Sequence, residues 1–319
     1  MEQIRPERIF SIHSPEEFER LALDVFRFQA SACQIYKKFI SGLGIDPQKI
    51  NRIEEIPFLP IEFFKTHIVT SSDKPAEIVF TSSGTGSTAR SRHAVADLDL
   101  YEQSFRKGFE FFCGKISDYT VLALLPSYLE REGSSLIYMA DALIRESGSE
   151  ESGCFLYNYD ELYQTLNLLK DQKRPVILIG VTYALVDFAA SYKLNFPQLI
   201  IMETGGMKGR RREMIRKELH ELLCAGFGVD QVHSEYGMTE LLSQAYSKGN
   251  GRFGCPPWMK VLVRDMNDPL TLLGADRTGG LNVIDLANLN SCSFIAVQDL
   301  GKLDTDDGAY WRPRADCGR

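Results

Sequence analysis

Val232-His233-Ser234-Glu235-Tyr236-Gly237-Met238-Thr239-Glu240 overlaps the end of a short apolar run, Val229–His233, that predicts a β-strand. In open α/β sheets, ligands bind where the carboxyl ends of the strands meet the following loops. Here the ring of Tyr236 can stack on a purine, the hydroxyl of Thr239 can reach a phosphate, and Glu240 supplies an oxygen ligand for Mg²⁺. The alternative is an ordinary turn, in which the charge of Glu240 favours the start of the next helix.

Around this stretch, short apolar runs alternate with helical patterns from residue 76 to residue 257. The predicted strands are Ile78–Thr81, Thr120–Leu125, Val176–Ile179, Leu199–Met202 and Val229–His233. The predicted helices are Asp97–Cys113, Ser134–Glu146, Tyr159–Asp171, Tyr183–Tyr192 and Arg211–Leu223. Such alternation favours an α/β fold whose sheet is mainly parallel and flanked by helices.

The segments on either side of this core have different patterns. In residues 1–75, an N-cap at Ser14 and apolar residues at helical spacing predict a helix that ends near Gly42. Two prolines in Ile56–Lys65 then favour an extended connector. In residues 258–312, the predicted strands form a smaller β-rich subdomain; they are Lys260–Arg264, Gly280–Asp285 and Ser293–Leu300.

Composition narrows the class of protein. The chain has 319 residues, of which 44% are hydrophobic and 25% charged, which excludes a disordered or collagen-like chain. Its net charge is −7, so a broad nucleic-acid surface is not expected. The seven cysteines form no C-x-x-C pair, and the charged N-terminus and short apolar runs predict neither a signal peptide nor a membrane span. We expect a cytoplasmic protein.

A loop rich in hydroxyl groups and glycine follows the first predicted strand of the core. It carries Ser82, Ser83, Gly84, Thr85 and Gly86. Glycines let backbone N–H groups approach phosphate oxygens, and the hydroxyls donate further hydrogen bonds. Neither the Walker A pattern nor the G-x-G-x-x-G pattern is present, so the alternative is a flexible surface turn. His93, just beyond, either helps to bind polyphosphate or, as we expect, occupies a solvated loop position.

Two further stretches and one histidine complete the candidate site. Gly205 and Gly206 follow a predicted strand and permit close backbone contact with a flat ligand. Asp299 stands at a predicted strand end and suits the hydroxyls of a ribose, its alternative being an ordinary turn. His233 either orients a substrate or is an ordinary strand-end histidine. The cations of Lys208–Arg212 either attract a phosphate-bearing ligand or begin a solvated helix.

Four of these stretches are Ser82–Gly86, Gly205–Gly206, Tyr236–Glu240 and Asp299–Leu300. They occur in the order found in the adenylate-forming superfamily of acyl-CoA synthetases, which the chain resembles. It looks most like the acyl-protein synthetases of bacterial luminescence, and more distantly like the phenylacetate–CoA ligases. The resemblance extends over residues 15–316 and includes Ile56–Lys65, Ser82–Gly86 and Leu125–Arg131. It implies the fold of the large N-terminal domain of such an enzyme, with the C-terminal domain largely absent.

The resemblance also implies a reaction: ATP and Mg²⁺ activate a carboxylic acid to an acyl-adenylate, and a thiol then takes the acyl group. The implied triphosphate loop is Ser82–Gly86. Adenine contact falls to Gly205, Gly206 and Tyr236, phosphate contact to Thr239, Mg²⁺ binding to Glu240 and ribose binding to Asp299. Thr239, Glu240 and His233 are the candidate catalytic residues.

Two features depart from the family pattern. The loop lacks the usual Pro-Lys-Gly, so we expect Arg90 or Arg92 to supply the positive charge. Residues 313–316 resemble the hinge to a C-terminal domain that carries a catalytic lysine, and only three residues follow them in this sequence. Cys317 is therefore either an acyl acceptor or, as we favour, an incidental residue short of the true acceptor.

The sequence thus predicts an enzyme that passes a fatty or similar acyl group to a protein cysteine. The first alternative is an acyl- or aryl-CoA ligase. The second is a non-catalytic nucleotide-binding subunit of an acyl-reducing complex. The partners implied are the carboxylic acid together with an acyl-transferase or reductase complex, a carrier protein or CoA.

Overall fold

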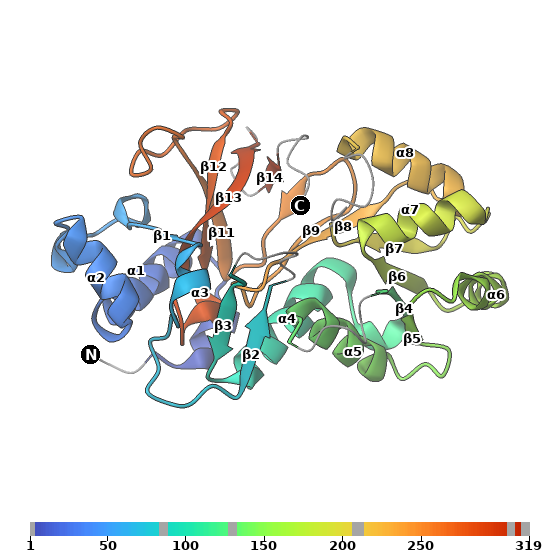
Figure 1. Cartoon of the computed structure of the whole chain (residues 1–319), viewed down its shortest axis with the longest axis horizontal. Coiled ribbons are helices and arrows are strands. Elements are labelled where there is room, and N and C mark those ends of the chain that lie inside the picture. Colours follow the sequence, from blue (N-terminus) through green and yellow to red (C-terminus); the bar gives the residue numbers. More distant parts are fainter. Residues whose placement is uncertain (1–3, 83–88, 127–132, 206–213, 305–309, 314–319) are drawn as a thin grey trace.

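The computed structural model describes residues 4–82, 89–126, 133–205, 214–304 and 310–313. In these ranges twelve strands form one mixed sheet, and two more form a separate hairpin (Figure 1). Along the sheet the strands run β11 (Met259–Arg264), β12 (Gly279–Asp285), β13 (Phe294–Leu303), β14 (Tyr310–Pro313), β10 (Phe253–Gly254), β9 (Ala245–Ser247), β8 (His233–Tyr236), β7 (Ile200–Glu203), β6 (Val176–Gly180), β4 (Thr120–Leu124) and β5 (Gly153–Phe155). The twelfth, β1 (Leu59–Pro60), pairs in parallel with β13.

The half of the sheet from β5 to β8 is parallel, as the alternating pattern predicts. Strands β4 and β6 are buried along their whole length because helices cover both faces, and this is why they read as continuous apolar runs. Successive residues enter two cores: Ile177 packs in one and Leu178 in the other. The second core contains α6 (Tyr159–Lys170), α7 (Thr182–Ser191) and α8 (Arg216–Phe227).

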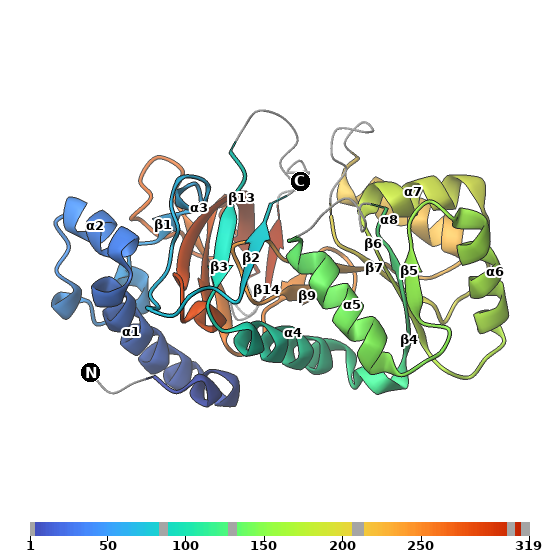
Figure 2. The same ribbon diagram turned by 60° about the horizontal axis from the view of Figure 1, so that its bottom comes forward.

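The opposite face carries α4 (Leu98–Cys113) and α5 (Ser135–Ser147), which lie below the sheet in Figure 1 and next to each other in Figure 2. From β8 to β11 the sheet becomes antiparallel, except where β1 joins β13. Helices α1 (Pro15–Ala32) and α2 (Gln34–Gly42) pack at that end, far from α6 in both views. The α/β fold is confirmed, with a mixed sheet in place of mainly parallel sheets.

One buried side chain of helix α1 forms hydrogen bonds with this end of the sheet. Gln29 donates from Nε2 to the carbonyl oxygens of Asn288 and Leu289, at 2.9 and 3.0 Å, and accepts from the Ser293 N–H at 2.8 Å. The predicted N-cap is present, because Ser14 Oγ accepts from the Glu17 N–H. The single predicted helix is in fact two, since Cys33 has extended backbone between α1 and α2.

Three expectations about strands also differ from the structure. The run Ile78–Thr81 is β2, but it pairs only with β3 (Arg92–Val95) in the antiparallel hairpin outside the main sheet. The strand expected at Val229–His233 is displaced to His233–Tyr236, because residues 229–232 form the connection from α8. Asp299 lies inside β13 rather than at a strand end. The connector Ile56–Lys65 contains β1 and the short helix α3 (Phe63–Thr66).

The hydrogen-bonded sheet runs across the boundary predicted at residues 257 and 258, since β10 and β9 join β14 to β8. The division into segments 1–75, 76–257, 258–312 and 313–319 remains our proposal for the organisation of the chain. None of the helices formed by the described residues combines the length and the apolar character that a membrane crossing requires.

Candidate nucleotide-binding site

Tyr236 and Asp299 meet across the bend of the sheet. The Tyr236 hydroxyl donates to Asp299 Oδ2 at 2.7 Å. Their strands, β8 and β13, are four steps apart in the sheet, which in a flat sheet is about 19 Å at the usual strand spacing. The sheet must therefore curl, and Trp311 packs edge-on against the Tyr236 ring, 4.7 Å between centroids. A predicted adenine contact and a predicted ribose contact are thus neighbours.

The Gly205 turn, at the end of β7, is held by a buried carboxylate. Glu203 Oε2 accepts from the Gly205 N–H at 2.9 Å and from the Thr182 hydroxyl at 3.1 Å, while Arg216 bonds Oε1 at 2.6 Å. Gly205 has φ +74°, a conformation that favours glycine. Burial alone would raise the pKa of Glu203, but His220 and Arg216 beside it lower the pKa to about 2. Glu203 is therefore charged and fixes the turn.

Thr239 and Glu240 belong to the segment Thr239–Ser243. Buried side chains from other parts of the chain form hydrogen bonds with the backbone of this segment. His93 Nδ1 lies 2.9 Å from the Thr239 carbonyl oxygen, and Asn288 Nδ2 donates to the Glu240 carbonyl at 2.8 Å. Asp285 Oδ2 accepts from the N–H groups of Leu242 and Ser243, each at 2.9 Å. The geometry of this segment is therefore set before any ligand arrives.

The side chain of Glu240 fits the metal-binding role in part. Glu240 is buried, and no side chain of the described residues forms an ion pair or hydrogen bond with its carboxylate. Within the described ranges, no group of three or more His, Cys, Asp and Glu side chains could hold a metal by itself. Mg²⁺ commonly binds through one or two carboxylates together with substrate phosphates, and a single carboxylate suits that mode.

The hydroxyl-rich loop begins and ends in the β2–β3 hairpin. Ser82 Oγ accepts from the Ser91 N–H at 3.0 Å, and the Ser82 N–H donates to the Ser91 carbonyl at 3.0 Å. Ser83, Gly84, Thr85 and Gly86 lie outside the described residues, as do Gly206, all of Lys208–Arg212, and Cys317. Arg90 and Arg92 are exposed at the closing end of the loop. Two arginine side chains are therefore accessible to a phosphate at that end of the loop.

Two histidines differ from expectation. His93 is buried rather than solvated, because strand pairing turns its side chain inward, where Phe64 packs edge-on against the ring. His233 is the first residue of β8, three residues before Tyr236 and about 10 Å from it along the strand. Burial and the charge of Lys248 lower the pKa of His233. The structure does not bring His233 to the Tyr236 end of its strand, and its catalytic role remains a prediction.

A buried polar cluster lies under the Tyr236–Gly237 turn. Glu235 and Tyr246 are directly opposite each other on β8 and β9, and Glu235 Oε1 is 2.3 Å from the point a Cβ on Gly237 would occupy. Only glycine therefore fits there without displacing the carboxyl group. Burial and the nearby charge of Glu203 raise the pKa of Glu235 to about 8, so this carboxyl is neutral at pH 7.

Sequence reasoning missed several residues that build the site. Glu203, Arg216, Asp285 and Asn288 act on the backbone of the turns or on one another, and no local motif marks them. One signal was available: Glu203 directly precedes the Gly205 turn and lies at the carboxyl end of a predicted strand.

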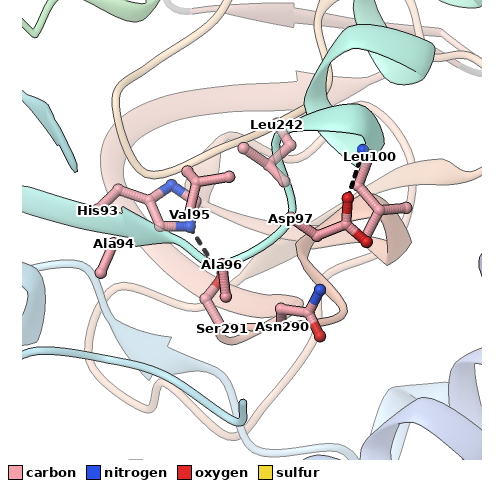
Figure 3. Close-up of a pocket in the computed structure, with 9 residues that line it drawn as sticks. All are labelled: His93, Ala94, Val95, Ala96, Asp97, Leu100, Leu242, Asn290 and Ser291. Carbon is pink, nitrogen blue, oxygen red and sulfur yellow. Dashed lines mark hydrogen bonds between the residues drawn. The ribbon is translucent and has the colours of Figure 1, made fainter. Parts of the chain in front are cut away.

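A small pocket borders His93, where Ser291 and Asn290 meet Asp97 (Figure 3). His93 Nε2 lies 2.9 Å from Ser291 Oγ on its wall. The pocket has room for about one water molecule, so it does not take a nucleotide.

Comparison with known proteins finds one family that matches the N-terminal part of the chain and one relative with local identity. The model of the acyl-protein synthetase family LuxE matches residues 10–101. A long-chain-fatty-acid–luciferin-component ligase of Photorhabdus luminescens is 38% identical over 68 residues, which cover 21% of this chain and 58% of that protein.

Among solved structures, a 2-hydroxyisobutyryl-CoA ligase in an open conformation with 2-HIB-AMP and CoA matches 93% of this chain and 68% of its own, with TM-score 0.67 and 14% identity. ATP-bound MatB from Rhodopseudomonas palustris matches 76% of this chain and 47% of its own, with TM-score 0.55 and 17% identity. These likenesses show the fold. Residues 10–101 thus match the acyl-protein synthetase family LuxE, and the chain shares the fold of the 2-hydroxyisobutyryl-CoA ligase over 93% of its length.

Proposed function

We propose that this protein uses ATP to activate a fatty or similar carboxylic acid as an acyl-adenylate and passes the acyl group to a protein thiol. The observation that carries the proposal is the junction of Tyr236 and Asp299, with the Thr239–Ser243 segment fixed beside it. Residues suited to a nucleoside and residues suited to its phosphates lie within four positions of one another on β8 and the following loop.

The chemistry requires two anions to approach each other, because the acid's carboxylate must attack the α-phosphate while pyrophosphate leaves. We assign phosphate contact to Thr239 and the hydroxyl-rich loop, including Ser82. Glu240 would hold Mg²⁺, which supplies positive charge to the phosphates. Preformed donors and a fixed geometry lower the barrier to such a displacement.

We assign the nucleoside to the other side of the site. Gly205 and Tyr236 would contact the adenine, with Tyr236 keeping its hydroxyl on Asp299. The Asp299 carboxylate would accept from a ribose hydroxyl. The Glu203–Arg216 pair holds the Gly205 turn in the shape that admits a flat ring.

The acceptor of the acyl group separates our proposal from its alternative. The match to a luciferin-component ligase favours a protein thiol. The alternative, an acyl-CoA ligase, is favoured by the fold likeness to the 2-hydroxyisobutyryl-CoA ligase. Incubation with ATP and a labelled fatty acid distinguishes them, since hydroxylamine-sensitive label appears on protein in the first case and acyl-CoA in the second.

The first half-reaction is tested by acid-dependent ATP–pyrophosphate exchange over a panel of aliphatic and aromatic acids. We expect exchange with at least one acid, and Glu240→Gln should lower kcat by roughly 100-fold because a metal-binding charge is lost. Glu221→Gln, an exposed carboxylate on α8, is the matched control. If the protein binds ATP and no acid supports exchange, the chain is a nucleotide-binding subunit and our proposal is wrong.

The charge on the hydroxyl-rich loop has its own test. We expect Arg90→Ala or Arg92→Ala to weaken ATP binding by roughly tenfold, because a charge-assisted contact to phosphate contributes about 1–2 kcal/mol. Isothermal titration calorimetry measures the affinity, with Arg52→Ala, which is exposed elsewhere, as control. Unchanged affinity in both variants would remove arginine from the triphosphate site.

A further inference from the structure

We propose that His93 is a positioning residue for the proposed adenylation site, which fixes Thr239 and Glu240 by bonding the Thr239 carbonyl from strand β3. This inference rests on the proposed function, and its test is designed to separate the two.

The hydrogen bonds of His93 define its role. Its Nδ1 lies 2.9 Å from the Thr239 carbonyl oxygen and its Nε2 lies 2.9 Å from Ser291 Oγ. A carbonyl oxygen only accepts, so Nδ1 must carry the proton and Nε2 then accepts from the Ser291 hydroxyl. The ring is 1% exposed, and burial lowers its pKa to about 4, so one neutral tautomer persists at neutral pH.

The position of His93 in the chain makes this contact a link between two parts of the site. His93 pairs with Phe80 in the hairpin, and two hydrogen bonds between Ser82 and Ser91 close the loop just above it. Thr239 is 146 residues further along the chain. One imidazole thus joins the strand that ends the hydroxyl-rich loop to the carbonyl of the residue assigned to the phosphate.

Other side chains hold the backbone of Thr239–Ser243 from the opposite end. Asn288 binds the Glu240 carbonyl, and Asp285 binds the N–H groups of Leu242 and Ser243. These side chains belong to β12 and the turn after it. They hold the end of the segment, and His93 holds its beginning. The Leu241 N–H also donates to the Met238 carbonyl at 3.1 Å, so Thr239 and Glu240 are the central residues of a turn. Without His93, the central peptide of this turn loses the bond to its carbonyl and can rotate while the turn stays closed, and the Thr239 and Glu240 side chains move with it.

A rotation of this kind affects chemistry more than binding. Displacements of about 1 Å at reacting groups can lower a rate by about 100-fold. Substrate affinity depends on many other contacts and changes less. Loss of the His93 contact should therefore appear mainly in kcat, whereas damage to the fold would also lower thermal stability and the affinity for ATP.

The test uses two amides that imitate different atoms of the ring. In His93→Asn, the amide nitrogen takes approximately the place of Nδ1 and can still donate to the Thr239 carbonyl. In His93→Gln, the amide reaches toward Ser291, in the place of Nε2. His93→Ala removes both contacts. We expect His93→Ala and His93→Gln to lose roughly 10- to 100-fold in kcat of ATP–pyrophosphate exchange, with KM for ATP changed less than about threefold.

The asparagine variant is the decisive one. His93→Asn should retain kcat within about threefold of the parent protein. Equal losses in His93→Asn and His93→Ala, at equal melting temperatures, would overturn the proposal, as would full activity in His93→Gln. Ser291→Ala keeps the Thr239 contact and serves as a control that disturbs only the far side of the ring.

Hydrogen exchange provides a second readout that needs no activity. Peptides covering residues 238–244 should exchange faster in His93→Gln than in the parent protein or in His93→Asn, while peptides from α7 should be unchanged. Equal exchange in all the proteins contradicts the positioning role. If the parent protein shows no acid-dependent exchange of pyrophosphate but the peptide pattern holds, the proposed function fails, and His93 fixes Thr239 and Glu240 for some other role.

Discussion

Glu203 shows how a single residue can determine the shape of a binding turn. It is 2% exposed, yet it keeps its charge because His220, Arg216 and the Gly205 N–H surround it and lower its pKa. Breaking a buried ion pair by removing one partner costs more than the pair contributes, since the other charge loses its compensation.

We therefore predict that Glu203→Gln lowers the free energy of unfolding by about 2–4 kcal/mol at pH 7. Urea unfolding measures this loss. The exposed pair Lys217–Glu221 lies on α8, the helix that carries Arg216, so Glu221→Gln is the control and should cost less than about 0.5 kcal/mol. Equal losses in the two variants would mean that the Glu203 pair is no stronger than a surface contact.

At the residue scale, the sequence identified groups by their chemistry and missed those that act by position. Tyr236, Thr239, Glu240 and Asp299 stand in recognisable motifs, and the structure places Tyr236 and Asp299 in contact. His93 was expected in solvent because it follows a charged loop. Pairing with Phe80 decides its burial, and no local spacing rule identifies a partner 13 positions earlier in the chain.

At the scale of elements, the ends of α5 and α8 offer a matched comparison. Both helices end at a glycine in the left-handed conformation, Gly148 with φ +60° and Gly228 with φ +69°. A Cβ on Gly148 would meet open space, whereas on Gly228 it would lie 2.6 Å from Asn195 Cα and 2.7 Å from the Leu194 carbonyl oxygen.

We predict that Gly148→Ala costs about 1 kcal/mol, from backbone conformation alone. Gly228→Ala adds a clash with backbone atoms, so it should lower the free energy of unfolding by about 1–3 kcal/mol more than Gly148→Ala does. Urea unfolding of the two variants gives the comparison. Similar losses would show that the segment around Asn195 moves aside readily.

Element prediction succeeded where burial made the pattern strong. Strands β4 and β6 are apolar throughout, and helix α4 begins after Asp97, which was included in the predicted range. The strands β9, β10 and β14 were missed because they have two to four residues each and are defined by distant partners. Such pairing is a property of the folded chain, and short segments carry little periodicity of their own.

For the molecule as a whole, Glu235 makes stability depend on pH in an unusual direction. Burial raises its pKa from 4.5 to about 8, so between these values the folded chain holds a proton that the unfolded chain releases. The stabilisation from this group is complete below pH 4.5 and is lost as the pH rises through 8. Between these two pH values, this group lowers the free energy of unfolding by about 1.4 kcal/mol for each pH unit.

Glu235→Gln removes this dependence, because an amide stays neutral. Its free energy of unfolding, relative to that of the parent protein, should increase steadily from pH 5 to pH 8. Urea unfolding at three pH values measures the difference, and contributions from His93 cancel because both proteins contain it. A difference that does not vary with pH would show that Glu235 is ionised in the folded protein.

The hydrogen bonds between Gln29 and Ser293 also have a consequence for the folding of the chain during its synthesis. These residues are 264 positions apart, so the surface that receives helix α1 is synthesised long after α1 itself. At the usual rates of translation, about 5–20 residues per second, Phe26 of α1 waits on the order of 10 to 50 s on the ribosome for Phe294, whereas its other aromatic neighbour, Tyr36, follows within ten residues. The face of α1 that packs on the sheet would therefore stay exposed throughout most of elongation, and holding chaperones would have their main task there.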